Sequence, residues 1–193
     1  MMVIHQHFLN IMNLEQKFIK NLVLLTPTVF EDERGYFFES YNKSKLADLG
    51  IHIDFVQDNQ SFSKRGTLRG LHYQNPPFAQ TKLVRVLQGE IMDVAVDLRK
   101  DSPTFGKYFG ILLSAENKKQ LLVPQGFAHG FSVLSETAVV SYKCDQYYHK
   151  QSEGGIRYDD ATLQIDWGMD LANAIVSEKD RVLPDFKNCN SQF

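Results

Sequence analysis

The sequence predicts a single all-β domain, and three observations support this prediction. Most of the chain consists of short apolar or alternating runs separated by Gly, Pro, Asn or Asp, which is the pattern of strands joined by turns. Aromatic residues make up 12% of the chain and include 14 Phe and 8 Tyr, which favours strands. The length of 193 residues suits one domain with a substantial core. Many short strands in one domain indicate a sandwich, a jelly roll or a barrel.

The strand pattern recurs along most of the chain. It covers residues 21–30, 35–41, 53–57, 67–74, 82–99, 108–116, 119–135 and 137–144. Within the stretch EIMDVAVDLR, one alternating set is plainly apolar and predicts a core face: Met92, Val94, Val96 and Leu98. Residues 42–50 predict a short helix closed by Gly50, and residues 170–180 are expected to hold one or two helical turns. No repeat or linker divides the chain, so we expect one domain over residues 1–193.

Charge, cysteine content and hydropathy exclude several classes of protein. The formal net charge of −2 gives no electrostatic case for nucleic acid or an anionic membrane as the main partner. The two cysteines, Cys144 and Cys189, are too few for a disulfide framework and favour a reducing compartment. No run reaches the roughly 18 apolar residues of a membrane span, and the N-terminus lacks the basic start of a signal peptide. We therefore expect a cytoplasmic protein whose residues 1–11 form a loose extension.

Two histidine motifs lie within the predicted strands. The stretch LHYQ contains His72, and the stretch VPQGFAHGF contains His129. The pattern P-x-G-x-x-H in the second stretch resembles the second half of the cupin signature, a jelly roll whose interior often holds a metal. The first half of that signature, His-x-His followed by a glutamate, has no counterpart in this sequence. Two histidines are too few for a good metal site, so we expect no resident metal.

A histidine inside a barrel can instead act as a base, because its pKa lies near neutrality. A proton next to a ketone is a suitable target, since the negative charge then spreads onto oxygen as an enolate. Such chemistry needs a base, a group that stabilises the enolate and an acid, for which His72, Lys82 and Tyr142 are candidates. Residue spacing alone leaves the ordinary alternatives open, namely a core histidine, a solvated lysine at a strand edge and a core tyrosine.

Longer motifs, in a fixed order, carry a resemblance to a known family. They are FEDERGYFFESY, FVQDNQSFSKRGTLRGLHYQ, QTKLVRVLQGEIMDVAVDLRKDSPTFGKY, LSAENKKQLLVPQGFAHGFSVLSE, YKCDQYY and SEKD. From about residue 20 to 183, the chain resembles the dTDP-4-dehydrorhamnose 3,5-epimerase family. The resemblance implies a cupin-like jelly-roll barrel of antiparallel strands with a few short helices. It also implies a place in dTDP-L-rhamnose biosynthesis for surface polysaccharide.

The resemblance implies a mechanism without a cofactor. The family substrate is dTDP-4-dehydro-6-deoxy-α-D-glucose, whose C4 ketone acidifies the protons at C3 and C5. By similarity, His72 is the base and Asp180 is the carboxylate that hydrogen-bonds it. Lys82 matches the lysine that supports the enolate oxygen, and Tyr142 matches the acid on the opposite face of the sugar.

The resemblance also implies substrate contacts and a homodimer. The positions that match family substrate contacts are Arg34, Glu39, Gln57, Asn59, Arg69, His129, Glu153 and Lys179. Arg69 and Lys179 are suited to a diphosphate, and Phe37 and Tyr148 could stack on thymine or sugar. The family dimer exchanges its N-terminal strands between subunits, so Arg34 and Glu39 are expected to serve the neighbouring site.

Two departures and three alternatives remain. Many relatives read E-R-G where this chain has Glu153, Gly154 and Gly155, and residues 1–11 have no family counterpart. The nearest alternative is an epimerase that inverts only C3 or only C5. A non-catalytic sugar-nucleotide-binding cupin and a metal-dependent cupin oxygenase are further alternatives. The sequence does not determine the preference among dTDP-4-keto sugars, the order of C3 and C5 inversion, or the glycan that uses the product.

Overall fold

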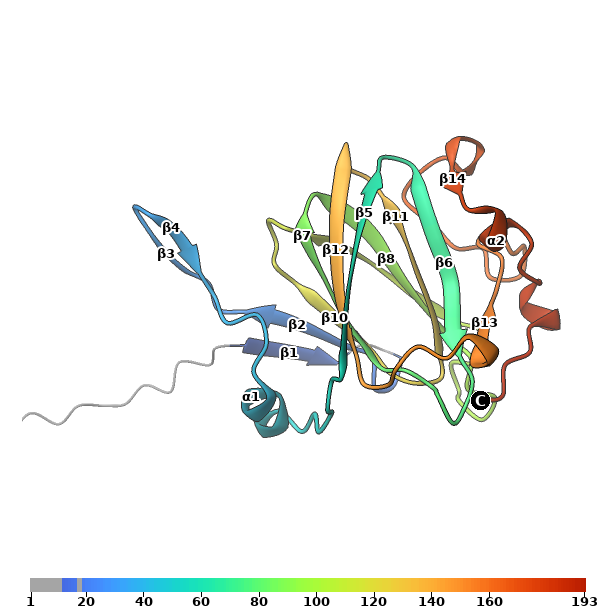
Figure 1. Ribbon diagram of the computed structural model, residues 1–193, viewed down its shortest axis with the longest axis horizontal. Helices are drawn as coiled ribbons and strands as arrows, with labels where there is room; N and C mark the ends of the chain where they lie inside the picture. The colour runs from blue at the N-terminus through green and yellow to red at the C-terminus, as the bar shows by residue number, and fades with distance from the viewer. Residues whose placement is uncertain (1–11, 17–18) are drawn as a thin grey trace, which may run out of the picture.

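Two antiparallel β-sheets face each other and enclose a jelly-roll barrel (Figure 1). The structure is a computed structural model that describes residues 12–16 and 19–193. The first sheet has the strand order β1-β2-β10-β7-β12-β5. Its strands are β1 (Met12–Gln16), β2 (Val23–Pro27), β10 (Gln120–Val123), β7 (Lys82–Gln88), β12 (Thr137–Cys144) and β5 (Gln57–Lys64).

The second sheet has the order β13-β6-β11-β8-β9, and β14 adds to it by parallel pairing with β6. Its strands are β13 (Glu153–Gly155), β6 (Thr67–Gln74), β11 (Phe127–Val133), β8 (Glu90–Asp97), β9 (Tyr108–Ser114) and β14 (Ile175–Val176). The α-helices and 3₁₀ helices are short: α1 (Lys43–Asp48), α2 (Glu178–Arg181), η1 (Lys150–Ser152), η2 (Leu171–Asn173) and η3 (Phe186–Asn188). This arrangement confirms the predicted all-β jelly roll of antiparallel strands with a few short helices.

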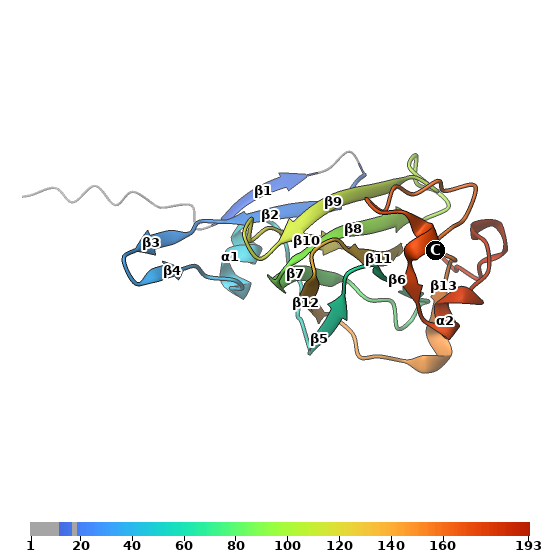
Figure 2. The ribbon, with the colours of Figure 1, turned by 90° about the horizontal axis from the view of Figure 1, so that it is seen from above.

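A small hairpin stands apart from the two sheets. Among the strands that the structure describes, β3 (Phe30–Asp32) and β4 (Gly35–Phe37) pair only with each other, and they project from one end of the barrel (Figures 1 and 2). Phe30, Tyr36 and Phe37 on this hairpin are all exposed. Exposed large rings on a projecting arm are costly in water and are typical of a surface that binds another molecule.

Apolar side chains form three buried clusters on the faces of the two sheets. The interior cluster combines side chains of both sheets, such as Val84 and Ala95. The second cluster covers the outer face of the second sheet, where the C-terminal part of the chain places Trp167 against Val96. The third cluster covers the outer face of the first sheet, where α1 contributes Leu46. The second sheet is therefore buried on both faces.

This two-sided burial adds to the prediction for β8. The set Met92, Val94, Val96 and Leu98 does pack in a core, as predicted, although Met92 is only partly buried. The alternate set, Ile91, Asp93, Ala95 and Asp97, is also buried, because it faces the barrel interior and one end of it. Strand β8 therefore lies between two cores, and both of its faces are buried.

Other sequence predictions were met to different degrees. Strands β6 and β12 coincide with the predicted segments 67–74 and 137–144. The helix predicted for 42–50 is α1, which Asn42 caps and which ends before Gly50. Residues 170–180 hold η2 and α2, as predicted, with β14 between them. The strand predicted for 53–57 is wrong, because the strand begins at Gln57 and runs to Lys64.

Two further predictions concern ends and membranes. The expected loose extension, residues 1–11, lies outside the described residues. Among the helices that the structure describes, none has the length and apolar character needed to cross a bilayer.

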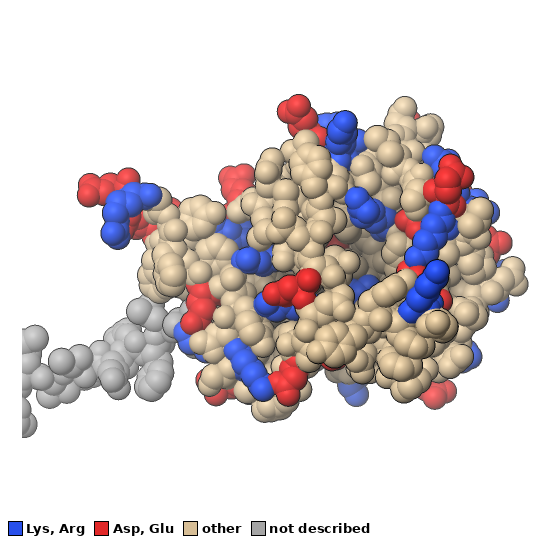
Figure 3. Space-filling model, in the orientation of Figure 1, with Lys and Arg blue, Asp and Glu red and all other residues tan. Residues whose placement is uncertain are grey.

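One face of the barrel is hollowed between β5 and β6, with Lys and Arg side chains around the hollow (Figure 3).

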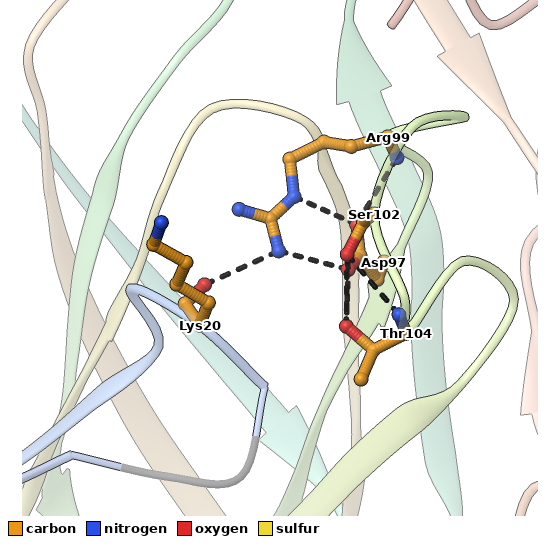
Figure 4. Close-up of polar contacts among 5 residues, drawn as sticks. All are labelled: Lys20, Asp97, Arg99, Ser102 and Thr104. Carbon is orange, nitrogen blue, oxygen red and sulfur yellow. Dashed lines mark hydrogen bonds and ion pairs between the residues drawn. The ribbon is translucent and has the colours of Figure 1, made fainter.

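The turn after β8 is held by a buried carboxylate, Asp97, at the centre of a hydrogen-bond network (Figure 4). Asp97 accepts bonds from Arg99 Nε at 2.8 Å, Ser102 Oγ at 2.6 Å and Thr104 Oγ1 at 2.7 Å. Burial alone would raise the pKa of Asp97, but these hydrogen bonds outweigh burial and hold it below its usual range. Arg99 also donates to the Lys20 carbonyl at 3.2 Å, so the network ties the N-terminal part of the chain to the barrel.

We expect Asp97→Asn to lower the free energy of unfolding by about 3 kcal/mol, because it leaves Arg99 without its buried carboxylate. Denaturant unfolding of the purified protein measures this loss. Asp101→Asn, on the exposed part of the same turn, is the matched control and should change stability little. Equal stabilities for the two variants would contradict this account of the network.

Candidate active site

Two adjoining cavities lie between the sheets, below the hollow in Figure 3. Their volumes are about 700 Å³ and about 320 Å³. His72, Lys82 and Tyr142 line both cavities, so these three side chains stand where the cavities meet. The structure thus places the three candidates for proton transfer in one space, although they come from three different strands.

His72 and Asp180 form a hydrogen-bonded pair in this space. His72 Nε2 lies 2.7 Å from Asp180 Oδ1. The Asp180 side chain is 5% exposed and that of His72 is 29% exposed, so the carboxylate is buried and the ring borders the cavity. A carboxylate that holds one ring nitrogen fixes the orientation of the imidazole.

Backbone and helix geometry place Asp180 in position. Ser177 caps α2 by accepting a bond from the Asp180 N–H, and the Gly70 N–H donates to Asp180 Oδ2 at 3.4 Å. Burial alone would raise the pKa of Asp180, but the hydrogen bond and the charge of His72 outweigh burial and keep it below its usual value. Asp180 is therefore ionised at neutral pH and can stabilise an imidazolium.

The glycine in LRGLHYQ allows β6 to approach β11 closely. Gly70 has φ of +118°, and a Cβ there would come within 2.6 Å of the Gly130 Cα. The pairing of β6 and β11 shifts register between His129 and Phe131, at this contact. Any larger residue at position 70 would push the two strands apart, and the main-chain N–H of that residue would no longer be presented to Asp180.

Lys82 and Tyr142 approach the cavity from the other sheet. Lys82 starts β7 and Tyr142 lies in β12, whereas His72 belongs to the second sheet. Burial lowers the pKa of Lys82, although nearby acidic groups, among them Cys144 and Asp93, oppose this shift. Burial raises the pKa of Tyr142, so the phenol keeps its proton at neutral pH. Neither side chain is a solvated edge charge or a pure core residue.

A second histidine–carboxylate pair lies deeper in the barrel. His129 is the register partner of His72, and its Nε2 lies 2.8 Å from Asp93 Oδ1. Both side chains are buried, with Asp93 fully enclosed. Sequence reasoning missed Asp93, although an aspartate on the interior face of an apolar strand was a visible signal. A buried carboxylate needs a partner, and His129 supplies it.

The remaining predicted contacts divide into three groups. The larger cavity is lined by Arg69, His129 and Lys179, and the smaller one by Gln57, Asn59 and Glu153. Arg69 is held by Ser63, whose hydroxyl accepts from Nε at 3.0 Å, and Lys179 pairs with Glu153 at 2.5 Å.

Arg34 and Glu39 form the third group and line neither cavity of this chain. Arg34 lies on the β3–β4 hairpin and pairs with Asp32, while Glu39 pairs with Lys45. The structure of one chain therefore does not bring these two residues to His72.

The described residues contain no group of three or more His, Cys, Asp or Glu side chains placed to bind a metal ion. His72 and His129 each bond to a separate carboxylate. The donor set of the cavity thus suits proton transfer and hydrogen bonding to an organic ligand.

Comparisons with known proteins agree with this geometry. A family model described as dTDP-4-dehydrorhamnose 3,5-epimerase matches residues 16–188. The dTDP-4-dehydrorhamnose 3,5-epimerase of Shigella flexneri is 51% identical over 170 residues, which is 88% of this chain and 93% of that protein.

Two crystal structures are similar over most of their length. That of dTDP-4-dehydrorhamnose 3,5-epimerase from Elizabethkingia anophelis NUHP1 has a TM-score of 0.88 at 56% identity and covers 92% of this chain and 97% of that one. The second is the crystal structure of dTDP-6-deoxy-D-glucose-3,5-epimerase from Legionella pneumophila Philadelphia 1 in complex with dTDP-4-keto-L-rhamnose. It also has a TM-score of 0.88, at 48% identity, and the match covers 92% of this chain and 94% of that one. This chain belongs to the dTDP-4-dehydrorhamnose 3,5-epimerase family.

Proposed function

We propose that this chain inverts C3 and C5 of dTDP-4-dehydro-6-deoxy-α-D-glucose to give dTDP-4-dehydro-β-L-rhamnose. The observation that carries the proposal is the hydrogen-bonded pair of His72 and Asp180 on one wall of the cavity, with Tyr142 on the opposite sheet. Inversion at carbon requires a proton to leave from one face and to arrive at the other. Membership of the family supports the same reaction and substrate.

The proposed chemistry begins with proton transfer from carbon to His72. The C4 ketone acidifies C3 and C5, and His72 takes the proton as the C–H electron pair forms the enolate double bond. Lys82, when protonated, stabilises the negative enolate oxygen. Tyr142 then donates its proton to the opposite face of the carbon, and the ketone re-forms. Proton exchange with water resets both groups before the second centre reacts. The substrate and the product have the same oxidation state, so no redox cofactor takes part.

The cavity also has side chains suited to the nucleotide. Arg69 and Lys179 supply positive charge beside the reacting centre, which suits a diphosphate. The exposed ring of Tyr148 lies at the smaller cavity and is suited to stacking on thymine or sugar. Binding energy from these contacts positions the sugar for reaction.

The proposal is tested by hydrogen exchange in D₂O with dTDP-4-dehydro-6-deoxy-α-D-glucose, with products read by mass spectrometry and NMR. We expect deuterium at both C3 and C5, and we expect His72→Ala to lower the rate by about 100- to 10,000-fold. Deuterium at only one carbon would identify a single-centre epimerase. An absence of exchange despite substrate binding would leave a binding protein.

The pH profile of kcat/KM tests the role of Lys82. The protonated lysine is the active form, and it is lost as pH rises through its folded pKa, which burial lowers below about 10.5. We therefore expect activity to fall at a lower pH than an ordinary lysine would give. Lys82→Arg should move this alkaline limb to higher pH, because guanidinium stays charged. Tyr142→Phe is the control and should reduce the rate while leaving the limb in place. An unmoved limb in Lys82→Arg would refute the assignment.

We also propose a homodimer in which the β3–β4 hairpin and Glu39 complete the neighbour's site. The exposed rings of the hairpin and the distance of Arg34 from the cavities of its own chain support this arrangement. The arrangement follows the exchange of N-terminal strands expected from the family.

Mixing two inactive variants tests the exchange. Arg34→Ala and His72→Ala subunits, co-expressed with different tags, should regain roughly a quarter of wild-type activity, because half of randomly assorted dimers are mixed and each has one intact site. If Arg34 served its own chain, every site would be defective and mixing would restore nothing. The control is co-expression of two differently tagged His72→Ala subunits, which should restore no activity.

A further inference from the structure

We propose that Gln74 is a positioning residue for nucleotide binding, because its side-chain amide fixes the loop that carries Tyr148 over the smaller cavity. This inference rests on the function proposed above and concerns the same site. Gln74 is not among the family contact positions matched in the sequence, and its role follows from its hydrogen bonds.

Gln74 lies at the end of β6, two residues after His72 and therefore on the same face of the strand. Its side chain lines the smaller cavity, yet the residue is only 5% exposed. A buried amide must use its donors and its acceptor within the protein, since each unpaired group costs free energy.

The Gln74 amide bridges two loops. Nε2 donates to the Phe78 carbonyl at 2.6 Å and to the Tyr147 carbonyl at 3.3 Å. Oε1 accepts from the His149 N–H at 2.7 Å. The amide thus binds the main chain directly before and directly after Tyr148, and it joins that loop to the loop after β6.

The contacts of Tyr148 explain why its backbone must be held. Its N–H donates to Gln57 Oε1 at 3.0 Å, and its hydroxyl donates to Glu153 Oε2 at 2.9 Å. Both acceptors line the smaller cavity, as Tyr148 itself does. The ring is 54% exposed, so its position depends on the backbone on either side and on these two bonds. A displaced loop would move the ring away from both acceptors, which lie on β5 and β13.

A stacking contact supports the same loop. The rings of Phe78 and His149 are parallel within 12°, with centroids 3.8 Å apart. The same two residues bond the Gln74 amide, because the Phe78 carbonyl accepts from Nε2 and the His149 N–H donates to Oε1. Stacking and the amide therefore act on the same two loops, and either one can be removed separately.

Loss of the clamp should affect binding more than chemistry. A loop that is already ordered binds a ligand without the entropy cost of ordering, whereas a released loop must be ordered by the ligand. The side-chain hydrogen bonds of Gln74 go to the main chain of Phe78, Tyr147 and His149, and the bond between His72 and Asp180 does not involve that loop. The expected signature is a raised KM with an almost unchanged kcat.

The test uses Gln74→Met, which keeps the length of the side chain and removes its three hydrogen bonds. We expect KM for dTDP-4-dehydro-6-deoxy-α-D-glucose, and Kd for dTDP measured by calorimetry, to rise about tenfold, with kcat within about twofold of wild type. Asn117→Leu is the matched control. Its amide also bonds three main-chain groups, in the turn before β10 outside both cavities, and its loss should lower stability while leaving KM unchanged.

A double-mutant cycle with Tyr148→Ala separates positioning from a general structural effect. If Gln74 acts through Tyr148, Gln74→Met should raise KM little in the Tyr148→Ala background. Two outcomes would overturn the inference. One is a double variant whose rise in KM equals the product of the two single-variant rises, and the other is an unchanged KM in Gln74→Met. Gln74→Glu, which keeps an acceptor for the His149 N–H and loses the amide donor to the Phe78 and Tyr147 carbonyls, gives a second test should Gln74→Met fail to fold. A rise in its KM with constant kcat supports the inference, and an unchanged KM opposes it. A wild-type protein that binds dTDP without turnover would refute the proposed function, and the dTDP affinities would still decide the role of Gln74.

Discussion

The contact between His72 and Asp180 is the one on which the site depends, and most of the fold is needed to make it. The two residues are 108 positions apart. Asp180 reaches β6 because β14 pairs with that strand and α2 begins directly after it. The carboxylate can stay buried and ionised only because it has partners: His72, the Gly70 N–H and the cap of α2. The close approach of β6 to β11 and the course of the C-terminal segment are therefore part of the site.

A barrel of two facing sheets suits a reaction that moves protons across a carbon. His72 and its carboxylate belong to one side, and Lys82 and Tyr142 project from the other sheet. A substrate held between the sheets would present opposite faces to the two sets. Burial raises the pKa of Tyr142 and so keeps its phenol protonated, whereas burial lowers the pKa of Lys82, and the nearby acidic groups Asp93 and Glu153 oppose that shift.

Sequence patterns predicted the parts of the fold whose side chains meet in an apolar core. Strands β6 and β12 were found at their true bounds because apolar residues alternate there. Strand β5 was misplaced because its inward-facing residues, from Gln57 to Ser63, are polar and line the cavity or support it. The pairing of His72 with Asp180 came from the family resemblance, since no spacing rule joins positions so far apart. Asp93 was missed although its place among the apolar residues of a predicted strand was a signal, and Gln74 was missed because its importance lies in contacts made only after folding.

The polar lining of the cavity is tolerated because other parts of the barrel supply the stability. A lysine, two histidines and two aspartates lie close together at one end of an interior that a purely structural barrel would fill with apolar side chains. The three apolar clusters on the inner and outer faces offset this cost, and the second sheet, packed on both sides, forms a rigid wall. Within the site, the buried carboxylates Asp180 and Asp93 are each hydrogen-bonded to a histidine. Rigid placement follows, and it is what allows weak acids and bases to act on carbon.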